Sequence, residues 1–290
     1  MTASSIRQIK QQIQQLTNGD IDNPLPSFWF TDWLLYVIDK PAIALMTDED
    51  YQLTDSELAQ FNAGVVKMKQ GTPLAYLTGH KEFWSLNFTV NEHTLIPRPD
   101  TEVLVEQVLN WINAQPTHNS NKRLLDLGTG SGCIAISLAH ELKQANWKVV
   151  AVDLSQEALK VAKHNAVING VADIKFVQSS WYQALPICDQ PQFDIIVSNP
   201  PYIDEEDEHL AGLKAEPISA LSAPNQGLAD IEHIVQQATK YLRTGGLLAI
   251  EHGYDQGDAV RQLFLNSNFE SVDTVKDYGG NDRVTLGQVQ

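Results

Sequence analysis

The sequence has few cysteines and few cationic residues. Its 290 residues include two cysteines, Cys133 and Cys188, which are too few for a disulfide framework or a thiolate metal site. We therefore expect both to be small, buried apolar side chains, and we expect no bound metal. Lys and Arg number 20 against 36 Asp and Glu, a formal net charge of −16. Such an acidic chain lacks the basic surface with which proteins bind nucleic acid or anionic membranes.

Long hydrophobic runs are also missing. No stretch reaches the roughly 18 apolar residues that span a bilayer, and the first eight residues lack the apolar core of a signal peptide. Apolar residues make up 43% of the chain and charged residues 19%, as in soluble globular proteins. The length allows one or two domains with a sizeable core. We expect a cytoplasmic protein without a membrane segment.

The most unusual stretch is Asn199-Pro200-Pro201-Tyr202, which follows an apolar run typical of a buried strand, residues 193–198. Consecutive prolines fix φ and lack amide hydrogens, so the backbone stiffens and leaves the sheet. The Pro200 carbonyl and the Asn199 side-chain oxygen are two acceptors, and Tyr202 adds a flat ring. These groups suit a clamp for a planar NH₂ group, such as a carboxamide or an exocyclic amine on a base. The alternative is a loop that only ends a strand.

A glycine-rich turn follows another expected strand, residues 123–127. The turn is Gly128-Thr129-Gly130-Ser131-Gly132, and an apolar helix begins at Cys133. Strand, glycine turn and helix together are typical of a Rossmann-like nucleotide-binding unit. The spacing is G-x-G-x-G, not the G-x-G-x-x-G of dinucleotide sites, and Asp126 precedes it. This favours a ligand with a cationic amino-acid end over a pyrophosphate.

Further polar and aromatic side chains stand at the ends of two neighbouring strands. Asp153 ends the expected strand 147–153, where a carboxylate can accept hydrogen bonds from both ribose hydroxyls; capping the next helix is the alternative. Ser180 and Trp181 follow the strand 174–177 and are placed to contact an adenine edge and face, although packing would also explain the tryptophan. Ligands of open α/β sheets bind outside the carboxyl ends of the strands. Four candidates fall on that edge: Gly128, Asp153, Trp181 and Asn199.

The first 75 residues predict a small helical bundle without a catalytic pattern. Apolar residues share one helical face over 6–16, an apolar helix covers 29–38, and Thr54 to Glu57 is a capping box for a helix that ends at Gly71. A connector over 76–97 follows. Its strand 86–90, a turn at 91–93 and the extended residues 95–97 predict a β-hairpin.

The remaining segments complete the expected sheet. Arg98, between two prolines, either contacts a substrate or pairs with a nearby carboxylate, and Asp100 or Thr101 caps a helix to about Ala114. The elements expected after the clamp are a helix over 231–242 ended by Gly245-Gly246, a strand over 247–251, a helix over 257–266, and antiparallel strands over 269–276 and 283–289. The fold class is α/β. We predict a helical bundle (1–75), a hairpin connector (76–97) and a Rossmann-like, seven-stranded catalytic domain (98–290).

These motifs resemble the class I S-adenosylmethionine-dependent methyltransferases and, more narrowly, the release factor glutamine methyltransferase family. Asp126 to Gly132 matches the cofactor motif, and Asn199 to Tyr202 the motif of amino-group methyltransferases, which DNA adenine methyltransferases share. Ile96 to Glu102 is the most specific match. Residues 71–83 and 216–221 also fit. The resemblance covers essentially the whole chain.

The resemblance implies methylation of the glutamine N5 atom in the Gly-Gly-Gln motif of class I peptide chain release factors. The cofactor is then S-adenosyl-L-methionine, bound by Asp126, Gly128, Thr129, Gly130, Ser131, Gly132, Asp153, Ser180, Trp181 and Asn199. Asn199, Pro200, Pro201, Tyr202 and Arg98 bind the substrate, and Asn199, Pro200 and Tyr202 are catalytic. The family carries Asp-Trp where this chain has Ser180-Trp181, and a serine bonds an adenine amine less strongly than a carboxylate.

Two further consequences concern partners and alternatives. The resemblance implies a release factor as the protein partner. We also expect a monomer without direct nucleic acid contact, and a helical bundle beside a catalytic domain suggests, by architecture alone, a module that recognises the substrate. A nucleic-acid adenine N6-methyltransferase and a ribosomal-protein glutamine methyltransferase are the enzymatic alternatives, and a Rossmann-like binding module is the non-enzymatic one. The acidic charge argues against a nucleic-acid substrate, and a binding module would not need a clamp beside a cofactor edge.

Overall fold

The structure is a computed structural model that describes residues 4–18, 25–115, 122–187 and 191–290. The chain divides into two compact units, Met1–Gly79 and His80–Gln290, called here the N-terminal and C-terminal units. Our interpretation of Cys188 lies outside the described residues, and Cys133 is half-buried. Within the described ranges, no helix is long and apolar enough to cross a membrane.

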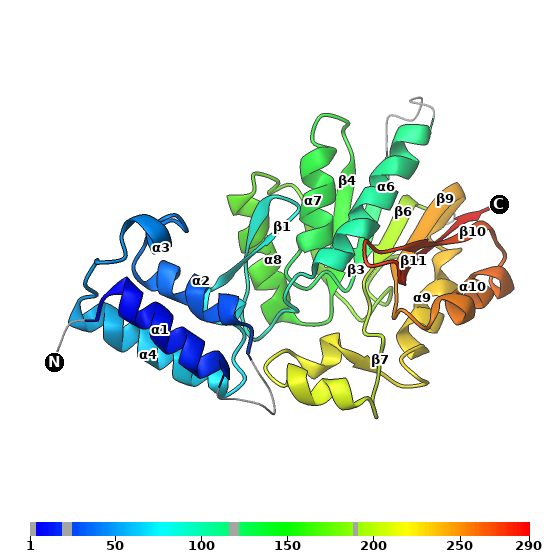
Figure 1. The fold of residues 1–290 in the computed structure, drawn as a ribbon. Coiled ribbons are helices and arrows are strands. Elements are labelled where there is room, and N and C mark those ends of the chain that lie inside the picture. The colour runs from blue at the N-terminus through cyan, green and yellow to red at the C-terminus, as the bar shows by residue number, and fades with distance from the viewer. Residues whose placement is uncertain (1–3, 19–24, 116–121, 188–190) are drawn as a thin grey trace. The chain divides into compact units, whose positions relative to one another are not determined.

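The N-terminal unit is built from helices, as the apolar periodicity predicts (Figure 1). They are α1 (Ile6–Asn18), α2 (Ser27–Val37), α3 (Ala44–Thr47), α4 (Asp55–Lys69) and α5 (Leu74–Thr78). The predicted capping box is confirmed, because the Thr54 hydroxyl accepts from the Glu57 amide and the Glu57 carboxylate from the Thr54 amide. Trp33 reaches from α2 to α4, where its Nε1 donates to the Phe61 carbonyl at 3.0 Å. Gly64 makes this possible, because a Cβ there would lie 2.2 Å from the indole.

The C-terminal unit contains the predicted seven-stranded sheet, in the order β10-β11-β9-β6-β3-β4-β5. Its strands are β3 (Arg123–Leu127), β4 (Lys148–Asp153), β5 (Lys175–Gln178), β6 (Phe193–Ser198), β9 (Leu242–Glu251), β10 (Phe269–Lys276) and β11 (Asp282–Val289). The strands from β9 to β5 run parallel, and β11 is antiparallel to both β9 and β10. The Rossmann-like class and the closing antiparallel hairpin are thereby confirmed.

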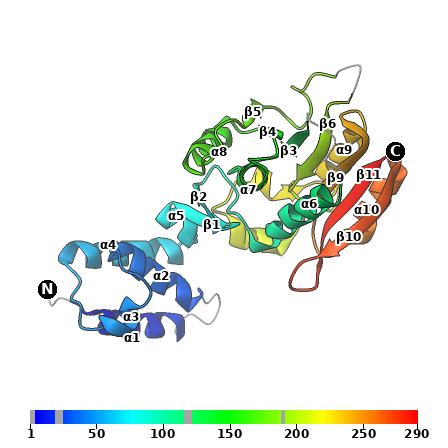
Figure 2. The ribbon, with the colours of Figure 1, turned by 90° about the horizontal axis from the view of Figure 1, so that it is seen from above.

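Helices cover both faces of this sheet (Figures 1 and 2). They are α6 (Glu102–Ala114), α7 (Cys133–Glu141), α8 (Gln156–Ile168), α9 (Ala229–Ala238) and α10 (Gly257–Asn266). One apolar cluster joins α6 and α7 to one face, and a second joins α9 and α10 to the other. Successive residues of β3, Leu124 and Leu125, enter opposite clusters. Burial on both faces explains why the central strands are apolar throughout.

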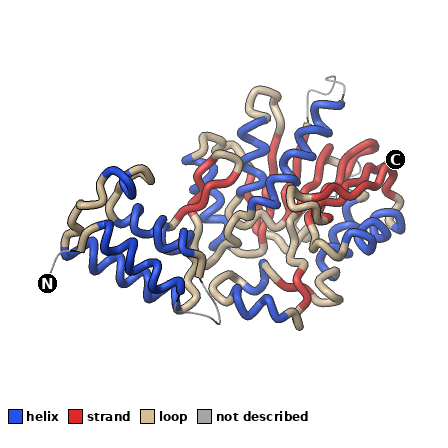
Figure 3. The backbone as a smooth tube through the Cα atoms, in the orientation of Figure 1, coloured by secondary structure: helices blue, strands red, loops and turns tan. Residues whose placement is uncertain are grey.

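The segment between β6 and α9 is mostly loop (Figure 3). It contains the short parallel strands β7 (Ile203–Asp204) and β8 (Ser222–Ala223) and two 3₁₀ turns, η2 (Glu208–Leu213) and η3 (Ile218–Ala220). Another 3₁₀ turn, η1 (Pro99–Thr101), precedes α6. The acidic residues 205–208 are exposed.

Two local predictions are wrong. The hairpin pairs β1 (His80–Phe83) with β2 (Leu86–Thr89), so its turn is Trp84-Ser85 and not residues 91–93, and residues 95–97 are loop. Both turn residues have positive φ, 52° and 56°, although neither is the Gly, Asn or Asp that marks such turns.

The predicted helix 231–242 is too long, because α9 ends at Ala238 and Leu242 begins β9. Gly245-Gly246 therefore lies inside a strand. Gly245 has φ +74°, and here the register of β9 against β6 shifts, as in a β-bulge.

Candidate functional site

The parallel strands bring the predicted site residues to one edge of the sheet. β3, β4, β5, β6 and β9 are neighbours that run in the same direction, so their carboxyl ends face the same side. Gly128, Asp153, Ser179 and Asn199 follow or end four of these strands, and Glu251 ends the fifth.

The glycine-rich turn is built around the buried Asp126. Thr129 donates its hydroxyl hydrogen to Oδ2 of Asp126 at 2.6 Å. Oδ1 is buried and accepts no hydrogen bond of standard geometry in the described part of the chain, although the backbone amide of Ala135 also stabilises the charged carboxyl. Burial raises the pKa of this carboxyl to about 7, although the Thr129 hydroxyl opposes the rise. A cationic group of a ligand would stabilise its charged form, which fits an ammonium group at this position.

Asp153 ties the glycine-rich turn to the end of β4. Its Oδ2 accepts from the Gly130 amide and its Oδ1 from the Ser155 amide, both at 2.8 Å. Ser155, not Asp153, caps α8 by accepting from the Ala158 amide. Each carboxylate oxygen has two acceptor sites, so both retain capacity for a ligand hydroxyl. Burial raises the pKa of the Asp153 carboxyl, although the backbone amides oppose the rise.

Trp181 forms an aromatic wall against the same turn. A Cβ at Gly128 would lie 3.3 Å from Cζ3 of Trp181, a tight contact, and Gly128 has φ +72°, a backbone conformation that favours glycine. The tryptophan has φ +47°, a conformation that costs a bulky residue about 1–3 kcal/mol and concentrates at functional sites. Its Nε1 donates to Oδ1 of Asp230 in α9 at 3.1 Å. Ser180 is half-buried beside it.

The side chain of Asn199 has one end engaged by the protein. Nδ2 donates to Oγ1 of Thr101 at 3.2 Å, which leaves Oδ1 available as an acceptor. Our prediction that Asp100 or Thr101 caps α6 is wrong. Thr101 already has helical dihedral angles, φ −66° and ψ −19°, and its hydroxyl is used on Asn199 instead.

The backbone of the clamp is fixed from behind. Gln256 donates from Nε2 to the carbonyls of Tyr202 and Gln226, each at 2.9 Å. Gly227 lies so close that a Cβ there would come within 2.0 Å of the Tyr202 carbonyl oxygen. Pro200 and Pro201 are buried, whereas Asn199 is half-buried. The clamp therefore has a rigid backbone flanked by two half-buried side chains with polar groups, Asn199 and Tyr202.

Arg98 forms the ion pair that was one of its two interpretations. Its Nη2 lies 2.5 Å from Oε1 of Glu216, and the other Glu216 oxygen accepts from the Ile96 amide at 3.0 Å. The Arg98 side chain is 35% exposed, whereas that of Glu216 is 3% exposed. The pair therefore connects the segment before α6 with the loop before η3.

Sequence reasoning missed Glu251, which is 1% exposed. The Tyr202 hydroxyl donates to its Oε1 at 3.1 Å. A carboxylate that closes an apolar strand at the carboxyl edge was a signal that could have identified it. Gln256 and Asp230 carried no such signal, because their contacts depend on how distant loops meet.

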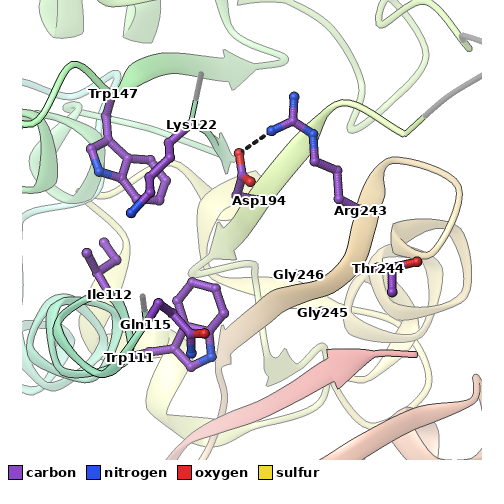
Figure 4. A pocket seen from close by; sticks show the side chains of 10 residues that line it. All are labelled: Trp111, Ile112, Gln115, Lys122, Trp147, Asp194, Arg243, Thr244, Gly245 and Gly246. Atoms are coloured by element: carbon purple, nitrogen blue, oxygen red, sulfur yellow. Dashed lines mark hydrogen bonds and ion pairs between the residues drawn. The ribbon is translucent and has the colours of Figure 1, made fainter. Parts of the chain in front are cut away.

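A separate pocket lies at the opposite edge of the sheet, near the amino ends of β3, β6 and β9 (Figure 4). It has a volume of about 220 Å³, and Trp111, Trp147 and Lys122 line it beside the Arg243–Asp194 ion pair, whose atoms are 2.7 Å apart. None of the predicted site residues lines it, so it is distinct from the edge described above.

Comparison with known proteins identifies relatives along the whole chain. Residues 118–283 match the family described as "Methyltransferase domain", and residues 8–79 match the "PrmC N-terminal domain". The release factor glutamine methyltransferase of Aliivibrio fischeri is 44% identical over 97% of this chain and 95% of its own length. That of Escherichia coli K12 is 47% identical over 82% and 83%, respectively. A methyltransferase from Pyrococcus furiosus shares the fold at 17% identity, with a TM-score of 0.51 over 78% of this chain and 98% of that one.

Proposed function

The chain belongs to the release factor glutamine methyltransferase family, and from this premise we propose how its site works. The protein is an S-adenosylmethionine-dependent methyltransferase. Its proposed reaction is transfer of a methyl group to the N5 amide nitrogen of the glutamine in the Gly-Gly-Gln motif of class I peptide chain release factors. The observation that carries the proposal is the Asn199 side chain, whose Nδ2 is committed to Thr101 while Oδ1 remains an acceptor.

The residues around the glycine-rich turn fit the cofactor. When bound, S-adenosylmethionine supplies an electrophilic methyl group on a sulfonium centre. Asp126, with its buried Oδ1, would accept from the ammonium group, and Asp153 from the ribose hydroxyls. Trp181 would contact the adenine face and Ser180 its edge, while Gly128 to Gly132 allow close approach of the backbone.

The clamp would activate a poor nucleophile. The lone pair of an amide nitrogen is delocalised into its carbonyl. Asn199 Oδ1 and the Pro200 carbonyl would each accept one amide hydrogen, which localises the lone pair and orients it. Pro201 and Tyr202 would enclose the flat amide. Most of the acceleration then comes from positioning and electrostatics, and the proton released after transfer leaves to water.

The remaining assignments concern recognition. Arg98 stays a proposed substrate contact, because a guanidinium has five donors and its side chain is about one-third exposed. We propose that the N-terminal unit recognises the release factor. We also propose a cytoplasmic monomer without direct nucleic acid contact; the net charge of −16 disfavours binding to a polyanion.

The test is mass spectrometry of a purified release factor after incubation with this protein and S-adenosylmethionine. The expected result is one added methyl group on the Gly-Gly-Gln glutamine. A release factor in which alanine replaces that glutamine is the control and should gain none. Methylation of another glutamine, or of adenine in DNA offered in parallel, would overturn the assigned substrate while keeping the enzyme class.

A further inference from the structure

Glu251 is a buried carboxylate that takes no part in the proposed mechanism. It ends β9 beside β6, where Ser198 pairs with Ile250, so Asn199 and Glu251 leave neighbouring strands side by side. It is 1% exposed, and Oε2 has no partner at hydrogen-bond distance within the described residues. A buried charge is costly unless it is paired and hydrogen-bonded, so the presence of a carboxylate here calls for an explanation.

The groups around this carboxylate are mostly donors. The Tyr202 hydroxyl donates to Oε1 at 3.1 Å, and the Thr101 hydroxyl, 2% exposed, also stabilises the charged carboxyl. Arg283 contributes a nearby positive charge and is itself held by Asp277, 3.0 Å away. The two polar side chains of the clamp, Asn199 and Tyr202, therefore both lead toward Glu251. Tyr202 is hydrogen-bonded to it directly, and Asn199 is hydrogen-bonded to Thr101, whose hydroxyl stabilises the charged form of Glu251.

The Thr101 hydroxyl fixes the direction, from donor to acceptor, of the hydrogen bonds between Asn199 and Glu251. The Thr101 hydroxyl has a single hydrogen, and its oxygen already accepts from Asn199 Nδ2 at 3.2 Å. That hydrogen is free to point at the carboxylate, which is only an acceptor when ionised. The order from Asn199 to Thr101 to Glu251 keeps Nδ2 turned inward and Oδ1 turned toward the ligand. If the hydrogen bonds ran in the opposite direction, the Asn199 carboxamide would be flipped. Its own NH₂ group would then face the substrate NH₂ group, which needs an acceptor.

We propose that Glu251 is a positioning residue that fixes, through Thr101, which end of the Asn199 carboxamide faces the substrate, and that holds the Tyr202 hydroxyl directly. The inference rests on the proposed function, because it concerns the same clamp. It identifies Thr101 as the residue that transmits the effect.

The first test compares Thr101→Val with Thr101→Ser. Valine keeps the shape but removes the hydroxyl, and serine retains the hydroxyl. With the release factor as substrate, we expect Thr101→Val to lower kcat by at least about tenfold. Thr101→Ser should stay within about threefold of the unmodified enzyme. Calorimetric affinity for S-adenosylmethionine should stay within the same range in both variants, which also shows that they fold. Equal kcat in Thr101→Val and the unmodified protein would overturn the inference.

The second test uses Glu251→Gln and the double variant. The glutamine side chain can donate as well as accept, so it no longer forces the Thr101 hydroxyl to point its hydrogen at residue 251. The Asn199 carboxamide is then free to flip, and kcat should fall. Thr101→Val added to it should cost little more, because both changes disrupt one chain of hydrogen bonds. Fully additive losses would contradict the proposed connection. If the unmodified protein methylates no release factor, the proposed function fails; if it does and these variants match it, only this inference fails.

A pH profile separates positioning from a merely structural role. Burial raises the pKa of Glu251 to about 7, opposed by Thr101, Arg283 and Tyr202 and reinforced by Asp100; Cys133 of α7 also lies within electrostatic range. A protonated Glu251 can donate a hydrogen bond to Thr101, so the Asn199 carboxamide is no longer held in one orientation.

At saturating cofactor, kcat of the unmodified enzyme should therefore rise as the pH rises through about 7. Glu251→Gln should lack this rise and resemble the unmodified enzyme at low pH. The same profile in both proteins would contradict the positioning role.

Discussion

Arg98 and Glu216 are 118 positions apart in the sequence and form an ion pair in which only the arginine reaches solvent. The carboxylate also accepts from the Ile96 amide. Two segments that resemble the family, 96–102 and 216–221, are thus one structural feature, a loop held against the residues before α6.

The unequal exposure of this pair predicts unequal effects of breaking it. Arg98→Met leaves a buried, unpaired carboxylate and should lower the free energy of unfolding by on the order of 2–3 kcal/mol. Glu216→Gln leaves an arginine whose guanidinium can rotate toward solvent, so it should lower the free energy of unfolding clearly less. Urea denaturation of both variants measures the difference, and a larger loss for Glu216→Gln than for Arg98→Met would contradict this asymmetry.

The acceptor role of Asn199 predicts a selective loss of catalysis. Asn199→Ala removes one of the two acceptors for the substrate amide but leaves the glycine-rich turn intact. Turnover of the release factor should fall by at least about a hundredfold. Cofactor affinity, measured by calorimetry, should change by no more than a few-fold. Unimpaired turnover would remove Asn199 from the clamp.

Replacing Asp153 should weaken cofactor binding without affecting the clamp. Asp153→Ala deletes the proposed ribose acceptor and also the anchor of the Gly130 amide. We expect affinity for S-adenosylmethionine to fall at least about tenfold, equivalent to about 1.4 kcal/mol. Unchanged affinity in a calorimetric titration would refute the ribose assignment. Asp230→Asn, which keeps a side-chain acceptor for the Trp181 indole, is the control and should bind nearly normally.

Gly227 and Gly245 provide a matched pair for testing the rigidity of the clamp. Both have positive φ, 77° and 74°, but a Cβ at Gly227 would collide with the Tyr202 carbonyl, whereas Gly245 has open space. Alanine at either position adds backbone strain of about 1 kcal/mol. Only Gly227→Ala should also displace the clamp and reduce turnover, by at least about tenfold. Equal activity of the two variants would indicate that the clamp tolerates movement.

The stability of the protein should depend on the charge of Glu251. Its pKa is raised by burial to about 7, above the roughly 4.3 of an unfolded chain. The folded state therefore binds more protons than the unfolded state between these values, and the group's contribution to stability is lost as the pH rises through about 7. Glu251→Gln removes the buried charge. It should gain on the order of 1–3 kcal/mol over the unmodified protein between pH 5 and pH 8 in urea unfolding. A variant that is destabilised equally at both pH values would indicate a structural carboxylate.

Local sequence patterns were enough to predict most of the C-terminal unit. The strands, the G-x-G-x-G turn and the helix that Ser155 caps depend on residues close together in the chain. The common edge of Asp153 and Asn199 followed from the rule for parallel sheets. The misplaced hairpin turn shows the limit, because Trp84 and Ser85 adopt positive φ without the residues that normally signal it.

The sequence by itself determined the succession of strands and helices, the glycine turn and the proline-stiffened segment 199–202, because each follows from local backbone preferences and apolar periodicity. Only the tertiary structure decided the partner of each polar side chain. Thr101 meets Asn199 across 98 positions, and Tyr202 meets Glu251 across 49. The physical reason is that a hydrogen bond needs its two atoms within about 3 Å, and only the packing of distant segments fixes position that closely.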